Sequence, residues 1–107
     1  LADQLLQLDQ ENQLILVDCL TLWLTNLLLA EDTALQQQTK KLLKVLPQLK
    51  SDIILVSNET GLGVVPMGEI SRRFVDEAGR LHQALGQLAD KVVFCVAGFP
   101  MILKGEK

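Results

Sequence analysis

This chain lacks the features that mark several classes of protein. Its 107 residues contain no apolar run of about 18 residues, so no transmembrane helix is expected. They show no charged N-terminal region followed by an apolar stretch, so no signal peptide is expected either. The net charge is −3 and no basic stripe is present, which argues against nucleic-acid binding. The remaining composition, with 49% hydrophobic and 4% aromatic residues, is typical of a soluble globular protein.

Cysteine is also scarce. The two cysteines, Cys19 and Cys95, each lie inside an apolar run. We therefore predict two buried, reduced thiols instead of a disulfide or a metal site. Reduced thiols fit a cytoplasmic location.

Strand-like and helix-like segments alternate along the chain. Short apolar runs predict strands over 14–17, 53–56 and 92–96, and a short edge strand over 101–103 after a turn at Gly98 and Pro100. Helical spacing predicts helices over 1–8, 20–30, 33–46 and 69–88, the third of them ending at Pro47. Strands separated by helices imply right-handed crossovers and one small parallel sheet.

The length of the chain suits one domain and not two. The chain opens on Leu1 instead of Met, and the predicted sheet is small for such apolar helices. We therefore expect residues 1–107 to be a single partial α/β domain, with further strands on its N-terminal side.

The most informative stretch is 53–66, which reads IILVSNETGLGVVP. An apolar strand ends in polar residues that include Asn58 and Glu59, and the chain then turns through Gly61 and Gly63. Ligands of open α/β sheets bind just beyond the carboxyl ends of the strands. This stretch is therefore a candidate ligand-contacting loop. The alternative is an ordinary turn with a polar rim.

Asp18 ends the apolar strand predicted over 14–17. Four apolar residues followed by an acid form the Walker B pattern, in which a carboxylate at the strand tip holds Mg²⁺ beside nucleotide phosphates. Thr21 follows on the next helix, within reach of the same nucleotide. The alternatives are that Asp18 caps the helix beginning near Leu20, and that the Thr21 hydroxyl is satisfied inside that helix.

A Walker B acid needs a phosphate-binding loop, a glycine-rich run that ends in Gly-Lys-Ser or Gly-Lys-Thr. No such run occurs in the 107 residues. Either the nucleotide interpretation is wrong or the phosphate loop precedes Leu1.

The helix predicted over 69–88 has a charged face. Its charged residues are Arg72, Arg73, Asp76, Glu77 and Arg80. Opposite charges four residues apart predict an exposed, ion-paired face; alternatively, Arg72 meets a phosphate. His82, the only histidine, has no cysteine or pair of acids arranged around it in the sequence. We predict an ordinary surface side chain instead of a catalytic one.

Two segments together resemble a known family. Residues 17–28, VDCLTLWLTNLL, and residues 57–66, SNETGLGVVP, are similar to motifs of the bifunctional adenosylcobinamide kinase / adenosylcobinamide-phosphate guanylyltransferases. Positions between Arg72 and Gln83 and the segment 96–104 follow the same pattern. The resemblance therefore covers nearly the whole chain from residue 14 on.

The resemblance implies a P-loop NTPase-like (RecA-like) α/β fold and two reactions of cobalamin biosynthesis. GTP or ATP phosphorylates adenosylcobinamide, and the product then receives GMP from GTP through a guanylylated histidine. Mg²⁺ as cofactor and a homo-oligomer, commonly a trimer, are also implied. On these grounds Asp18 and Thr21 are expected to bind nucleotide, with Asp18 also the metal ligand. The substrate or active-site loop is expected to include Asn58, Glu59, Gly61, Gly63 and Arg72.

The chain also departs from the family pattern. The phosphate loop and the nucleophilic histidine are both expected upstream of Leu1, so no catalytic residue is assigned in these 107 residues, and alone they are predicted to be inactive. His82 stands where many relatives carry Asn, and Val75 replaces an arginine of some members. Two alternatives remain open: a different P-loop kinase, and a non-catalytic α/β binding module.

Overall fold

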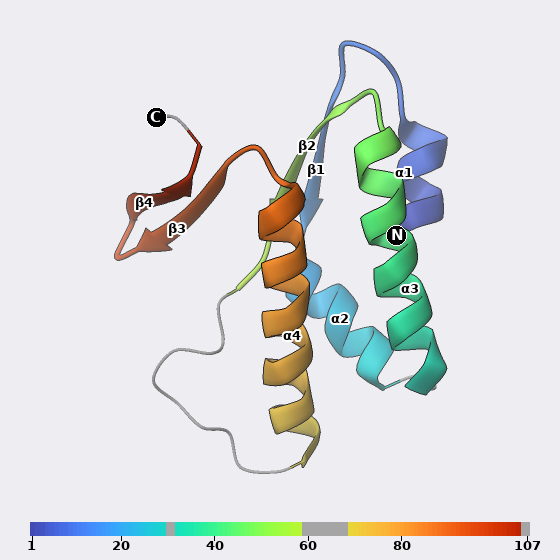
Figure 1. Cartoon of the computed structure of the whole chain (residues 1–107), viewed down its shortest axis with the longest axis vertical. Helices are drawn as coiled ribbons and strands as arrows, with labels where there is room; N and C mark the ends of the chain where they lie inside the picture. Colours follow the sequence, from blue (N-terminus) through green and yellow to red (C-terminus); the bar gives the residue numbers. More distant parts are fainter. Residues whose placement is uncertain (30–31, 59–68, 106–107) are drawn as a thin grey trace.

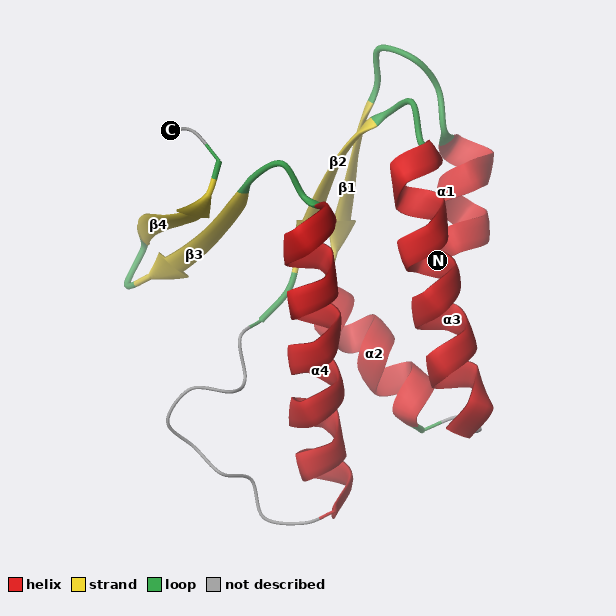
Figure 2. Ribbon diagram, in the orientation of Figure 1, coloured by secondary structure: helices red, strands yellow, loops and turns green. Residues whose placement is uncertain are grey.

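The structure, a computed structural model, describes residues 1–29, 32–58 and 69–105 (Figure 1). In chain order the elements are α1 (Ala2–Leu8), β1 (Leu14–Asp18), α2 (Leu20–Leu28), α3 (Asp32–Val45), the 3₁₀ turn η1 (Leu46–Gln48), β2 (Asp52–Val56), α4 (Glu69–Leu88), β3 (Val92–Val96) and β4 (Phe99–Lys104). Each helix and strand predicted from the sequence is present, and the chain is of the α/β class (Figure 2).

β1 and β2 form a parallel pair, as predicted. The register joins Leu16 to Ile54 and Asp18 to Val56, so the carboxyl ends of both strands lie at one edge. Exposure alternates along both strands with a period of two. One face packs on helices, since Val17 and Leu55 contact the core cluster there.

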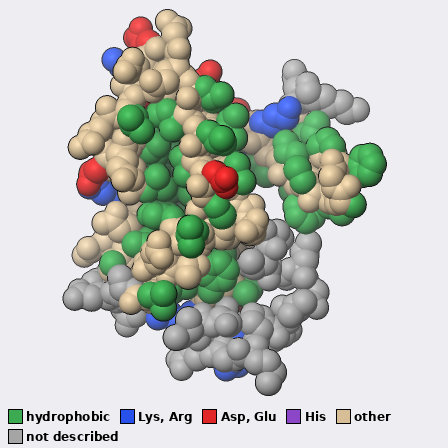
Figure 3. Space-filling model, turned by 180° about the vertical axis from the view of Figure 1, so that it is seen from behind, with side chains coloured by type: hydrophobic (Ala, Val, Ile, Leu, Met, Phe, Trp, Pro, Cys, Tyr) green, Lys and Arg blue, Asp and Glu red, His purple; other side chains and the backbone are tan. Residues whose placement is uncertain are grey.

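The other face of this pair is apolar and exposed. Its large side chains are Leu14, Leu16, Ile54 and Val56, each at least 40% exposed. Figure 3 shows hydrophobic side chains gathered in the middle of this side of the molecule and again on the hairpin formed by the last two strands.

The prediction of one parallel sheet is wrong for the last two strands. Among the described residues, β3 and β4 form a separate antiparallel hairpin, set apart from β1 and β2 (Figure 1). Ala97 and Gly98 connect them with φ angles of 50° and 81°. Two successive positive φ angles are typical of the tight turns that join antiparallel strands. The turn therefore precedes Pro100, which lies inside β4.

This hairpin also overturns the prediction for Cys95. The side chain of Cys95 is exposed and that of Cys19 is only partly buried; both thiols are free. The prediction assumed a strand covered on both faces. In the hairpin, however, Val93, Val96 and Phe99 are also exposed, so the strand is not in a core.

The core lies between the helices and the covered face of the strand pair. One cluster contains Leu20 of α2 with Leu81 and Leu85 of α4. A second contains Leu24, Leu35 and Ala78, and so joins α2, α3 and α4. Burying a leucine side chain of this kind contributes about 1.5–3 kcal/mol. These contacts fix α2 and α4 beside the ends of the strands.

A polar clamp holds α1 to the start of β2. The carboxylate of Asp9 accepts hydrogen bonds from the backbone N–H of Lys50 at 2.9 Å, the backbone N–H of Ser51 at 2.8 Å and the Ser51 hydroxyl at 2.8 Å. The Ser51 hydroxyl in turn accepts from the Gln10 backbone N–H and the Gln13 side chain. The hydrogen bond from Lys50, followed by those from Ser51, holds the pKa of Asp9 below its ordinary value. The clamp lies at the amino end of β2, opposite the strand tips.

The described residues contain no helix that is both long enough and apolar enough to cross a membrane.

Candidate functional site

The carboxyl ends of β1 and β2 bring several polar residues to one edge. Asp18 and Val56 are partners in the register, and the next residue along each strand is Cys19 or Ser57. α2 begins immediately, at Leu20. In α/β folds this edge of a parallel sheet is where ligands bind.

Asp18 presents an exposed carboxylate at this edge. The alternative in which it caps α2 is wrong, because Cys19 is the N-cap residue and no side chain makes a capping hydrogen bond there. Within the described residues no group of three or more His, Cys, Asp or Glu side chains is close enough to cage a metal. Mg²⁺ commonly takes only one or two carboxylates and completes its shell with water and substrate phosphates. A single exposed carboxylate fits that mode of binding.

Thr21 is buried, with 7% of its surface exposed. Its hydroxyl pairs with the Cys19 thiol, and its backbone carbonyl accepts the Thr25 hydroxyl at 2.8 Å. The Thr21 hydroxyl thus has a partner inside the chain, as the second alternative proposed. Its contact with a nucleotide stays a prediction.

Cys19 is the N-cap of α2 and lies between Asp18 and this helix. Its hydrogen bond with the Thr21 hydroxyl, followed by that from the Leu22 backbone N–H, lowers the pKa of the thiol below its ordinary value. A helix N-terminus has the same effect on a thiol, because it stabilises the thiolate. Sequence reasoning missed this property of Cys19, because a cysteine in an apolar run is usually an inert core residue.

His82 is more enclosed than an ordinary surface side chain. Its ring is half-buried, and its Nε2 lies 2.6 Å from the hydroxyl of Ser57, to which it is hydrogen-bonded. The prediction of an ordinary surface histidine is therefore wrong. Sequence reasoning missed this contact because 25 residues separate the two positions.

The remaining predicted residues fall into three groups. Asn58 is exposed just beyond β2, beside Ser57. Glu59, Gly61 and Gly63 lie outside the described residues. Arg72 is exposed in the first turns of α4, which Figure 1 shows away from the strand tips. The structure thus brings Asp18 and Asn58 to one edge, whereas Arg72 lies in the first turns of α4 and its contact with a phosphate stays a prediction.

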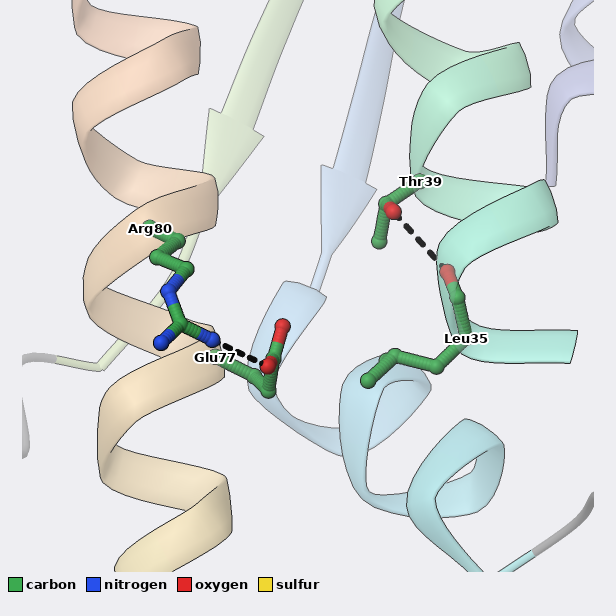
Figure 4. A network of polar contacts seen from close by, with 4 residues as sticks. All are labelled: Leu35, Thr39, Glu77 and Arg80. Atoms are coloured by element: carbon green, nitrogen blue, oxygen red, sulfur yellow. Dashed lines mark hydrogen bonds and ion pairs between the residues drawn. The ribbon is translucent and has the colours of Figure 1, made fainter. Parts of the chain in front are cut away.

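The charged face of α4 is partly as predicted. Arg80 is ion-paired with Glu77, three residues before it (Figure 4). The sequence had suggested Asp76 as its partner. Figure 4 also shows the Thr39 hydroxyl, which donates to the Leu35 carbonyl at 2.8 Å within α3. With 70% of the Arg80 side chain exposed, the pair contributes little to stability.

The fold and these residues define an α/β protein with a polar site at the carboxyl ends of two parallel strands. A family model described as "Cobinamide kinase / cobinamide phosphate guanyltransferase" matches residues 1–103. The chain belongs to this family, which confirms the resemblance.

Curated relatives agree with this assignment. The bifunctional adenosylcobalamin biosynthesis protein CobP of Pseudomonas aeruginosa is 63% identical over 93 residues, which cover 86% of this chain and 54% of that protein. The bifunctional adenosylcobalamin biosynthesis protein CobU of Escherichia coli is 30% identical over 117 residues, covering 95% of this chain and 65% of that protein. That of Salmonella typhimurium is 32% identical over 104 residues, covering 84% and 58%. The chain thus spans between about half and two thirds of the length of these relatives.

Proposed function

We propose that the protein carrying this chain phosphorylates adenosylcobinamide with GTP or ATP and then transfers GMP from GTP to the phosphorylated product. The family assignment supports this activity. The observation in the structure that carries it is the exposed Asp18 carboxylate at the tip of β1, in register with the end of β2. Carboxylate oxygens at such a strand tip suit a hard cation and the phosphates that it binds.

Asp18 is proposed to hold Mg²⁺. When bound, Mg²⁺ neutralises charge on the phosphates during transfer. Asp18 supplies one anionic ligand, fixed at the strand tip by its backbone pairing in the register with Val56. Asn58, exposed one strand away, offers an amide that both donates and accepts hydrogen bonds to the corrinoid side of the reaction. Thr21 is proposed to contact the nucleotide, Glu59, Gly61 and Gly63 to line the substrate loop, and Arg72 to meet a phosphate.

The 107 residues are proposed to be inactive by themselves. They hold no Gly-Lys-Ser or Gly-Lys-Thr run, whose backbone N–H groups and lysine cradle nucleotide phosphates. Their one histidine, His82, is hydrogen-bonded to Ser57 and is proposed not to accept GMP. We propose that the phosphate loop and the guanylylated histidine belong to other parts of the intact protein, and that the intact protein is a homo-oligomer.

The test uses the intact gene product with Mg²⁺, adenosylcobinamide, and GTP labelled at either the γ- or the α-phosphate. The proposal expects the γ-label on the corrinoid and an α-label on the protein. A γ-label on the corrinoid without an α-labelled protein would support the kinase activity but not the guanylyltransferase activity. The absence of both labels would overturn the proposal in favour of a non-catalytic binding module.

A further inference from the structure

The contact between Ser57 and His82 joins the strand edge to the helix layer. The Ser57 Oγ and the His82 Nε2 are 2.6 Å apart, and both side chains are half-buried. Ser57 continues the alternation of β2, in which Leu55 faces the helices and Val56 is exposed. His82 follows Leu81, a member of the core cluster, so its backbone is held in a fixed place.

This hydrogen bond differs from the hydroxyl contact that Thr25 makes. Thr25 donates a hydrogen bond to a carbonyl one turn before it in its own helix, a contact that is common for helical threonines. The Ser57–His82 bond instead crosses from a strand end to another element. A hydrogen bond of this kind fixes the first residue after β2, and with it the direction in which Asn58 leaves the strand.

The surface of α4 is open at two positions close to His82 in the sequence. Gly79 and Gly86 lie one helical turn before and after His82 on α4. A Cβ atom added at either glycine would meet no described atom within 4 Å. At these two positions α4 is therefore not packed under another described element.

We propose that His82 is a positioning residue for the corrinoid substrate. It holds the Ser57 hydroxyl, and through Ser57 it sets the orientation of Asn58 at the edge of the sheet. The corrinoid is assigned to the end of β2, because the end of the neighbouring strand β1 carries Asp18, the residue proposed for the cation and the nucleotide phosphates. The inference rests on the proposed kinase and guanylyltransferase function and adds a residue to it.

The experiment compares five forms of the intact protein with the wild type in γ-label transfer to adenosylcobinamide. They are Ser57→Ala, His82→Ala, the double variant, His82→Asn and the control Gln87→Ala, an exposed position on the same helix. Ser57→Ala and His82→Ala are each expected to raise the KM for adenosylcobinamide about tenfold and to leave the KM for the triphosphate within about twofold. The double variant is expected to be no worse than the poorer single variant, because both remove the same contact. His82→Asn, which keeps a polar partner for Ser57, is expected to recover most of the loss, and Gln87→Ala to match the wild type.

A purely structural role gives a different result. It would lower the folded fraction and therefore the apparent kcat, with both KM values unchanged, and this would overturn the inference. Additive losses in the double variant would overturn it as well. If His82→Ala does not fold, Ser57→Ala alone decides, since it removes only one oxygen atom. If the wild type transfers the label and the variants do so equally well, the positioning role alone is overturned. If the wild type transfers no label, both the proposed function and the positioning role are overturned.

Discussion

Asp18 and Asp52 are exposed carboxylates at opposite ends of the same parallel strand pair. Asp18 ends β1 at the carboxyl edge, whereas Asp52 begins β2 at the amino edge. Only the first lies beside Cys19 and Ser57, where the polar residues collect. Removing the charge of each acid in turn therefore distinguishes a general effect of charge on this sheet from an effect at the candidate site.

The clamp between α1 and β2 predicts a pH-dependent stability. The pKa of Asp9 is lowered in the folded chain, so its contribution is fully present above the ordinary Asp pKa and is lost as the pH falls below that value. Asp9→Asn is expected to lower the melting temperature at pH 7. At pH 3 the melting temperatures of the variant and the wild type are expected to differ less. Thermal unfolding followed by circular dichroism measures both. Asp90→Asn, at an exposed position, is the control; an equal loss in that variant would contradict the role of the clamp.

The packing of α2 predicts opposite results for two leucines on the same helix. Leu20 is 1% exposed and Leu22 is 64% exposed. Leu20→Ala should lower the free energy of unfolding by about 2–5 kcal/mol, because it leaves a cavity in the cluster with Leu81 and Leu85. Leu22→Ala should change it by no more than about 0.5 kcal/mol. Urea denaturation of both variants measures the difference, and similar losses would show that the exposed side of α2 is covered in the intact protein.

Two glycines near the end of the chain are predicted to respond in opposite directions to alanine. Gly105 has a φ of +89°, and a Cβ there would lie 2.6 Å from the Asp90 carbonyl oxygen, so Gly105→Ala should be destabilising. Gly86 lies inside α4 with open space beside it. Gly86→Ala should raise the free energy of unfolding by up to about 1 kcal/mol, the difference in helix propensity. Chemical denaturation measures both signs, and a stabilising Gly105→Ala would refute the close approach of the two backbones.

The hydrogen bond to Cys19 predicts a reactive thiol. The Thr21 hydroxyl is the largest cause of the lowered pKa of Cys19, so Thr21→Val should raise that pKa toward its ordinary value. Since the thiolate is the reactive form, the pH midpoint of alkylation by iodoacetamide should move upward. The measurement needs a Cys95→Ser background, because Cys95 is exposed and would react as well. An unchanged midpoint would mean that the helix N-terminus alone sets the pKa.

The sequence predicts the elements of this chain better than their assembly. The helix over 69–88 was predicted from the spacing of its apolar residues, because that spacing is a local property of the chain. The pairing of β3 with β4 depends instead on the positive φ angles at Ala97 and Gly98. An alanine in the sequence does not predict a positive φ angle. An apolar run alone does not tell a strand in a covered sheet from a strand in a hairpin.

The candidate site shows the same division. Asp18 and Asn58 were predicted because each follows an apolar strand, and parallel pairing then brings the two strand ends together. The contact of Ser57 with His82 is between a strand and a helix far apart in the sequence, so no local pattern reports it. The Thr21 hydroxyl likewise meets Cys19 through the geometry of the start of the helix.

The central claim is that the carboxyl edge of the strand pair forms the phosphate-transfer site. The most direct measurement is the rate of γ-label transfer from GTP to adenosylcobinamide by the intact protein carrying Asp18→Asn, with Asp52→Asn as the matched control. The account predicts a loss of about 100-fold for Asp18→Asn, because the ligand to the cation loses its charge, and a rate within about twofold of the wild type for Asp52→Asn. Equal rates for both variants and the wild type would contradict it.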